Sequence, residues 1–454
     1  MKRIILLLDG TWNDADQGPA DTNVVRLREI IAKCLESRPT GNAVQFVTPA
    51  SSANQISVSA GAYVSSGNQP TDHLVYYERG VGTGGFLDLF FGGAFGVGLS
   101  QNIRRAYRFL SLNYEDGDQV FVFGFSRGSY TARSLVGYIN TVGLLRRDSC
   151  TVENESLAWS YYRENPSDRV WGVGSSLKFG SHPDFEVSCV GVFDTVGALG
   201  IPAPAFWREN RDLFEFHDVS LTSGQTQHLH ALAIDEHRLS FEPTLWRKPK
   251  FGTASPTAEQ VWFAGAHSDI GGGNVDEEHG RNAPALDDLT LDWMIKRVLS
   301  RFANFPVKYN GTTNAWPHVD SRNAAAAQDE PRRRLYRALP FGWRSINNSQ
   351  VKVGFRERLV ARDRHAETIG EFVHISALQR LGRLVRIGGA ERYYAPMNLL
   401  SVLGNLSGTG GATNPLRVVD YDGSVMAAES VQQCVAAARI RLLEAEAMQL
   451  GSKS

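Results

Sequence analysis

The feature that most constrains this chain is a continuous strand–turn–helix pattern within residues 119–141. Residues 119–123, Gln-Val-Phe-Val-Phe, are an apolar run rich in β-branched and aromatic side chains, which predicts a buried strand. The run leads into Gly124-Phe125-Ser126-Arg127-Gly128, and the pattern then predicts a helix as far as Thr141. Such a turn holds a serine hydroxyl above the sheet edge at a helix N-terminus, and its glycines let strand and helix approach closely. We therefore expect Ser126 to be a nucleophile, the alternative being that Ser126 only caps the helix.

Composition places the chain among ordinary globular proteins. It has 454 residues, of which 42% are hydrophobic and 21% charged, with a formal net charge of -1. A near-neutral chain gives no electrostatic reason to expect a nucleic-acid partner. The four cysteines are scattered without metal-like spacing, which favours reduced thiols.

The N-terminus imitates a signal peptide, but the apolar run Ile4–Leu8 stops at Asp9. A run of this length is too short for an export signal, so we interpret residues 3–8 as the first strand. No stretch approaches the roughly 20 apolar residues of a membrane span. We expect the protein to be cytoplasmic as synthesised, with any secretion by a leaderless route.

Alternating strand and helix patterns predict an α/β fold with a mostly parallel central sheet flanked by helices. We expect a catalytic domain over residues 1–305 and a smaller C-terminal accessory region over 306–454 that ends in a helix from about 425 to 449. The expected strands are 3–8, 43–48, 74–77, 119–123, 187–193, 230–234 and 260–266, and the expected helices before residue 305 are 24–35, 102–114, 129–141, 153–163 and 286–303.

Two segments of the first domain do not fit the strand–helix alternation. Residues 49–72 are rich in small and polar side chains without a helical period, which predicts an inserted surface loop. Residues 86–99 interleave large apolar side chains with glycines. This segment is a candidate lid over a site for apolar substrates or, equally, a buried connection.

Three predicted strands after the serine end in polar residues suited to catalysis. They are followed by Asp194, by Asp235 and by His267. Ligands of open parallel sheets bind beyond the carboxyl ends of the strands. The order Ser126, acid, His267 is that of α/β-hydrolases, in which the histidine takes the serine proton and the acid orients the histidine. We favour Asp235 as the acid over Asp194, and both remain open.

Other histidines offer alternatives to this constellation. His374, in an apolar run, is a rival for the base. His228, His230 and His237 could suggest a metal, but no third ligand stands at a recognised spacing, so we expect no metal and no cofactor.

An oxyanion formed at the serine needs hydrogen-bond donors. We expect the backbone N–H of Arg127, together with one from Gly10 or Thr11 in the loop after the first strand.

With these residues identified, the chain resembles a bacterial family of uncharacterised α/β-hydrolase domains (DUF2235-like) that includes the type 1 lipase effectors of the type VI secretion system. The matching stretches are Leu8–Asn13, Gly80–Thr83, Gly124–Gly128, Phe193–Gly197 and Gly265–Gly273. The resemblance implies phospholipase or esterase chemistry with Ser126 as nucleophile and His267 as base. It also implies a lipid or ester substrate, contact with a membrane surface, and a secretion-system or immunity protein as partner.

These observations together predict a serine esterase or lipase that hydrolyses carboxylic esters through an acyl-enzyme, with glycerophospholipids as the substrate class. Two alternatives stay open. One is a catalytically silent hydrolase-like domain that binds a partner or a lipid, and the other is an esterase of small soluble esters.

Overall fold

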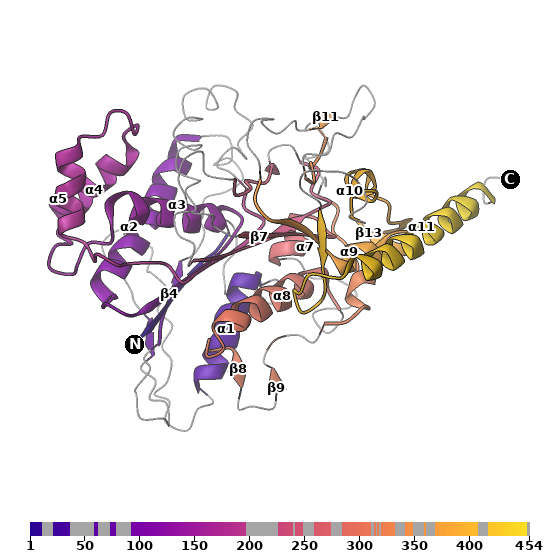
Figure 1. Ribbon diagram of the computed structural model, residues 1–454, viewed down its shortest axis with the longest axis horizontal. Helices are drawn as coiled ribbons and strands as arrows, with labels where there is room; N and C mark the ends of the chain where they lie inside the picture. The colour runs from indigo at the N-terminus through magenta and orange to yellow at the C-terminus, as the bar shows by residue number, and fades with distance from the viewer. Residues whose placement is uncertain are drawn as a thin grey trace.

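The chain forms one body with helices on both faces of a central sheet, as the computed structural model in Figure 1 shows. A helical pair near one end and the terminal helix at the other mark the long axis. The structure describes residues 1–10, 21–36, 59–61, 73–78, 92–196, 226–238, 241–247, 258–273, 284–309, 313–314, 316, 319–331, 341–347, 358–359, 368–406 and 416–451.

The elements follow one another in a largely alternating order. The strands are β1 (Arg3–Leu8), β2 (Ser59–Gly61), β3 (His73–Glu78), β4 (Gln119–Phe125), β5 (Cys189–Phe193), β6 (Gln227–Ala233), β7 (Ala258–Phe263), β8 (Lys308–Tyr309), β9 (Thr313–Asn314), β10 (Gly342–Trp343), β11 (Arg358–Leu359), β12 (Glu371–His374), β13 (Leu384–Ile387), β14 (Ala390–Tyr393) and β15 (Arg417–Val419). The helices are α1 (Asn23–Glu36), α2 (Gly92–Asn113), α3 (Arg127–Val142), α4 (Val152–Arg163), α5 (Trp171–Phe179), α7 (His267–Gly271), α8 (Leu286–Arg301), the 3-10 turn η5 (Asn323–Ala325), α9 (Ile375–Arg380), α10 (Met397–Val402) and α11 (Ala428–Gly451).

The central sheet has nine strands in the order β15-β12-β7-β6-β5-β4-β1-β3-β2. Every pairing is parallel except the one between β2 and β3. The carboxyl ends of β4, β5, β6 and β7 therefore lie next to one another at one edge of the sheet. The predicted fold class, a mostly parallel α/β-hydrolase-like sheet flanked by helices, is confirmed.

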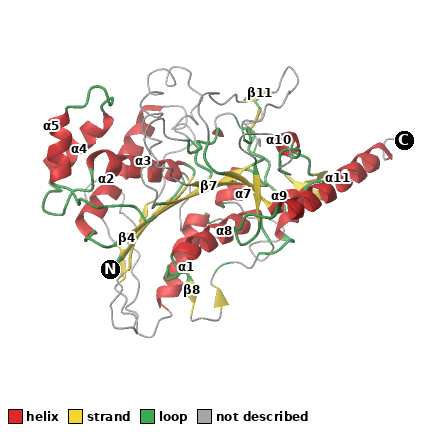
Figure 2. Ribbon diagram, in the orientation of Figure 1, coloured by secondary structure: helices red, strands yellow, loops and turns green. Residues whose placement is uncertain are grey.

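The two faces of the sheet are covered by different helices, as Figure 2 shows. Strand β1 is buried along its whole length, and its alternate side chains enter two separate cores. Ile5 and Leu7 pack with residues of α1 and α8, whereas Ile4 and Leu6 pack with residues of α2 and α3. This two-sided burial explains why the strand is an unbroken apolar run rather than an alternating one.

Most of the expected elements of the first domain are present with shifted ends. Strand β6 starts three residues before the expected strand, and α5 was not predicted. The expected strand at 43–48 and the loop at 49–72, apart from β2, lie outside the described residues, as does Phe86 to Phe91 of the candidate lid. The rest of that segment is helical, because Gly92 and Gly93 open helix α2. Glycines are tolerated there since the first N–H groups of a helix lack intrahelical partners.

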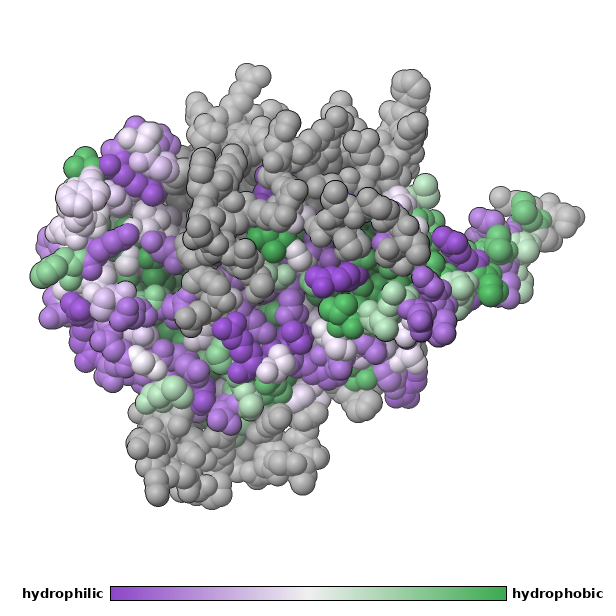
Figure 3. Space-filling model, in the orientation of Figure 1, coloured by the Kyte–Doolittle hydropathy of each residue, from purple (hydrophilic) through white to green (hydrophobic). Residues whose placement is uncertain are grey.

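The predicted boundary at residue 305 is wrong for the sheet. Strand β12 pairs with β7, and β15 pairs with β12, so the C-terminal region supplies two strands of the central sheet. A third apolar core joins these strands to α9, α10 and α11 and includes Trp262 of β7. The terminal helix packs on this core through Val431, Val435 and Ala438. Its outer end extends from the body and carries exposed hydrophobic side chains (Figure 3).

A truncation tests this correction. We expect a chain ending at residue 305 to be insoluble or unfolded, because the truncation leaves β7 as an open edge and uncovers the apolar side of β6 and β7. Soluble expression and the thermal unfolding midpoint of residues 1–305 and of the full chain would measure it. A truncated protein with the full chain's unfolding midpoint would contradict it.

Candidate active site

Ser126 lies in a strained turn between β4 and α3. Its φ is 57° and its ψ is -120°, a conformation that a non-glycine residue rarely adopts. Its backbone N–H donates a hydrogen bond to Phe193 O at the end of β5 (3.0 Å). Its side chain makes no capping bond to α3, so the capping alternative is not what the structure shows. A strained serine at the carboxyl edge of the sheet is the geometry expected of a nucleophile.

The glycines on each side of the serine are required by close backbone contacts. A Cβ on Gly124 would lie 2.6 Å from Gly128 O. A Cβ on Gly128 would lie 2.6 Å from Asp9 O and closer still to Leu8 O. The end of β1 therefore lies directly against the start of α3, beside the serine.

Replacing Gly128 with alanine should consequently cost about 1–3 kcal/mol of unfolding free energy, because backbone atoms at a packed site cannot move aside easily. Gly172 is the matched control, since a Cβ there meets nothing within 4 Å. Gly172→Ala in α5 should be neutral or stabilising, because alanine favours the helix. Urea denaturation of both variants measures the difference, and equal stabilities would show that the turn is not tightly packed.

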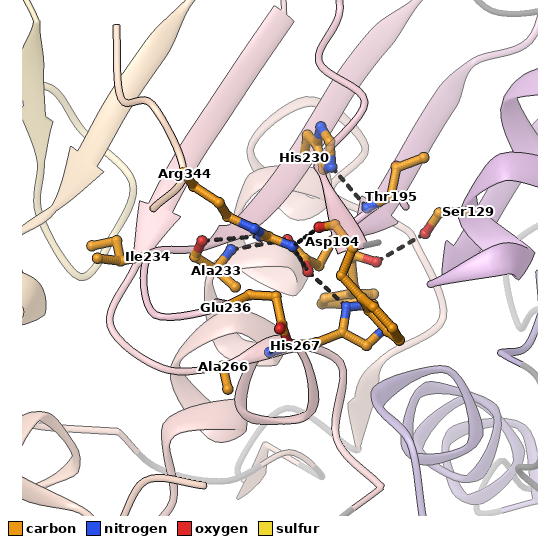
Figure 4. Close-up of polar contacts among 12 residues, drawn as sticks. Ser129, Asp194, Thr195, His230, Ala233, Ile234, Glu236, Ala266, His267 and Arg344 are labelled. Carbon is orange, nitrogen blue, oxygen red and sulfur yellow. Dashed lines mark hydrogen bonds and ion pairs between the residues drawn. The ribbon is translucent and has the colours of Figure 1, made fainter. Parts of the chain in front are cut away.

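His267 is the first residue of α7, just after β7, and it contacts one of the two candidate acids. Its Nδ1 lies 2.6 Å from Oδ2 of Asp194. Asp194 follows β5, is fully buried and has a φ of 41°. Figure 4 shows the imidazole of His267 pointing toward the carboxylate of Asp194. The ring of His267 also lies 4.7 Å from the ring of Phe125, the residue before the serine, so serine, histidine and acid share one edge.

The preference for Asp235 as the acid is corrected by the structure. The Asp235 carboxylate accepts hydrogen bonds from Gly265 N (2.7 Å) and from Tyr394 OH (2.8 Å), and among the described residues the hydrogen bond of the His267 ring to a carboxylate goes to Asp194. Burial raises the pKa of Asp235 to about 6. Asp235 therefore ties the end of β6 to the C-terminal region, and Asp194 is the carboxylate that pairs with the histidine.

An arginine that sequence reasoning missed completes the acid's surroundings. Arg344 follows β10, and its Nη1 and Nη2 donate to Oδ1 (2.6 Å) and Oδ2 (2.9 Å) of Asp194. Ala233 N also donates to Oδ1 (3.0 Å). No local pattern marked Arg344, because it stands alone in a stretch whose secondary-structure signals are weak.

These contacts set the protonation of the pair. Burial opposes ionisation of Asp194, but Arg344 and the hydrogen bond from His267 hold the pKa of that carboxyl well below its usual range. Burial lowers the pKa of His267, and Asp194 opposes that shift. The arrangement provides a neutral imidazole whose Nδ1–H is fixed by an ionised acid, leaving Nε2 to accept a proton.

The predicted oxyanion donors have different outcomes. Arg127 opens α3, where the first backbone N–H groups have no intrahelical acceptors. The N–H of Gly10 instead donates to Oδ1 of Asp9 (2.7 Å), so in this structure it is not available to donate to an oxyanion. Thr11 lies outside the described residues. Asp9 is buried, which raises its pKa to about 6, and it also accepts from Tyr77 OH (2.8 Å).

The remaining histidines have structural contacts. Nε2 of His230 accepts from Thr195 N (3.1 Å), and burial lowers the pKa of His230 to about 3. His374, the predicted rival, caps α9 by accepting from Ser376 N. His228 packs edge-on against Trp246, and His237 stacks on Phe341. Within the described ranges, no group of three or more His, Cys, Asp or Glu side chains is arranged to hold a metal ion.

None of the described helices is both long enough and apolar enough to cross a bilayer.

The model of a family described as the T6SS phospholipase effector Tle1-like catalytic domain matches residues 2–297. The chain belongs to this family. The match confirms the resemblance drawn from the five sequence stretches.

Individual relatives are more distant. The uncharacterised protein YEL023C of Saccharomyces cerevisiae is 29% identical over 196 residues, which is 38% of this chain and 27% of that protein. An uncharacterised protein from Pseudomonas aeruginosa has a solved structure with a TM-score of 0.33 and 16% identity, covering 65% of this chain and 45% of that one. The solved structure of a Tle1 effector bound to the VgrG spike of the type VI secretion system has a TM-score of 0.28 and 18% identity, and the match covers 61% of this chain and 51% of that one. The chain thus spans about a quarter of the curated relative and about half of each solved chain.

Proposed function

We propose that this protein is a serine esterase that hydrolyses carboxylic esters of glycerophospholipids through an acyl-enzyme. The observation that carries the proposal is that Ser126 has a strained backbone, makes no side-chain capping bond to α3, and lies at the same sheet edge as the buried His267–Asp194 pair. Membership of a family whose catalytic domain is described as that of phospholipase effectors supports the substrate class.

In the proposed reaction, Ser126 Oγ attacks the ester carbonyl carbon while its proton passes to Nε2 of His267. Asp194 holds Nδ1–H and stabilises the imidazolium that forms. The backbone N–H of Arg127 stabilises the negative charge on the carbonyl oxygen. The imidazolium then protonates the leaving alcohol, and water activated by the same imidazole releases the fatty acid from Ser126.

Among the described residues, Ser126 Oγ and His267 share no hydrogen bond, and the mechanism requires this bond to form when substrate binds. Hydrogen bonds of catalytic groups are often long without substrate and tighten in the substrate complex.

The test is hydrolysis of defined phospholipids with products identified by mass spectrometry. A phospholipase A releases free fatty acid and lysophospholipid, whereas cleavage on either side of the phosphate gives diacylglycerol or phosphatidate. Hydrolysis of p-nitrophenyl butyrate without release of fatty acid from the phospholipids would favour the small-ester alternative. Failure of a fluorophosphonate probe to label the protein would favour the silent binding domain, because only an activated serine reacts.

A secretion-system spike, an immunity protein and a membrane surface are the expected partners. Co-purification of the full chain with a VgrG-type spike protein would test the first of them.

A further inference from the structure

We propose that Arg344 is a positioning residue for the reaction: its guanidinium fixes the Asp194 carboxylate and sets the pH range in which His267 acts as a base. The inference rests on the proposed serine esterase function and assigns a role to the region beyond the family match, which ends at residue 297.

The guanidinium is held at four points. Besides the two bonds to Asp194, Nη1 donates to Ala233 O (3.0 Å) and Nη2 donates to Phe241 O (2.6 Å). Arg344 is 4% exposed, and its own carbonyl accepts from Nδ2 of Asn398 (3.2 Å). A planar fork bound on both carboxylate oxygens leaves the acid one orientation, which a single ammonium group could not impose.

The charges around His267 come from three sides. Asp194 and its partner Arg344 lie at Nδ1. Glu236, after β6, lies 3.4 Å from the backbone N of His267 and is paired with Arg238. On α7 itself, the Asp269 carboxylate accepts from the backbone N–H groups of Ala266 (2.8 Å) and Asp329 (3.0 Å).

Asp194 is paired with the guanidinium of Arg344 and Glu236 with that of Arg238, whereas burial raises the pKa of Asp269 to about 8. Without Arg344, the charge of Asp194 would act on the imidazole unopposed and favour the imidazolium. The pKa of His267 would then rise. Because only the neutral imidazole accepts the serine proton, the acid limb of the activity profile would move to higher pH.

The experiment compares Arg344→Gln and Arg344→Lys with wild-type protein, using p-nitrophenyl butyrate and the fluorophosphonate probe between about pH 5 and 9. Arg380→Gln is the matched control. Arg380 is also fully buried and comes from the C-terminal region, but it donates to Ala324 O and Ala326 O (both 2.8 Å) instead of to the acid. Thermal unfolding of each variant reports the folded fraction.

We expect Arg344→Gln to move the acid limb of kcat/KM upward by on the order of one pH unit. We also expect kcat to fall by about 10–100-fold at the optimum with little change in KM, because the acid loses its fixed orientation. Arg344→Lys should restore the position of the limb, since it restores the charge, but not the full kcat. Arg380→Gln should leave the limb in place even if it lowers the unfolding midpoint.

Three outcomes would overturn the inference. One is a folded Arg344→Gln variant whose acid limb of kcat/KM lies at the wild-type pH. Another is an Arg380→Gln variant whose acid limb shifts as far as that of Arg344→Gln. If Arg344→Gln does not fold, wild-type kcat in Arg344→Lys would show that the fork has no positioning role. Wild-type protein that neither hydrolyses the ester nor labels would contradict the proposed function itself, whereas active wild-type protein with an unmoved limb contradicts only the role of Arg344.

Discussion

Ser126→Ala should lower kcat for ester hydrolysis by on the order of 10⁴–10⁶ while leaving the fold intact. The large effect follows from removing the only atom that forms the acyl bond in the proposed mechanism. The fold should survive because the side chain makes no capping bond to α3, and the turn is held by the backbone bond from Ser126 N to Phe193 O. Steady-state kinetics and thermal unfolding measure the two effects.

Ser129 provides the matched control one turn further along α3. It is buried, and its hydroxyl donates to the same carbonyl, Phe193 O (2.9 Å). Ser129→Ala should cost about 1 kcal/mol of stability through the lost hydrogen bond and retain activity. Activity of Ser126→Ala within tenfold of wild type would contradict the mechanism, as would equal loss in both serine variants.

The second large effect separates the two acids. Asp194→Asn should lower kcat by about 10⁴, because an amide cannot stabilise the imidazolium and favours the wrong tautomer of His267. Asp235→Asn should stay within about tenfold, because an amide oxygen can still accept from Gly265 N or Tyr394 OH. Kinetics with a soluble ester, corrected for the folded fraction, give the ranking.

Asp194→Asn also leaves the buried Arg344 without its ionic partner, so a loss of stability is expected alongside the loss of activity. The split between kcat and KM separates the two effects, since unfolding reduces the amount of active enzyme without changing KM. A larger loss in Asp235→Asn than in Asp194→Asn would return the acid to the end of β6.

Local sequence patterns predicted the parts of the site that are encoded in contiguous residues. The strand and helix around Ser126 and the position of His267 after a buried strand could be predicted, because each is specified by its immediate neighbours. The choice between Asp194 and Asp235 could not, since both follow buried strands at the same sheet edge. Tyr394, far along the chain, binds the carboxylate of Asp235, and no periodicity carries that information.

The C-terminal region was misinterpreted for a related reason. Strands β12 and β15 are four and three residues long, too short to show a clear period. Their place in the sheet depends on pairing with β7, which is a long-range property. Arg344 is likewise a single residue whose importance comes only from the carboxylate that it meets.

The strain at the sheet edge has a consequence for how this sequence balances stability against activity. Ser126 and Asp194, with φ of 57° and 41°, are two of the three non-glycine residues with positive φ in the described chain. Each such conformation costs on the order of 1–3 kcal/mol, and glycine would remove most of that cost. A sequence optimised for stability alone would carry glycine at both positions. Serine and aspartate therefore occupy these positions although glycine would give a more stable fold, as expected where catalysis and not folding determines the residue.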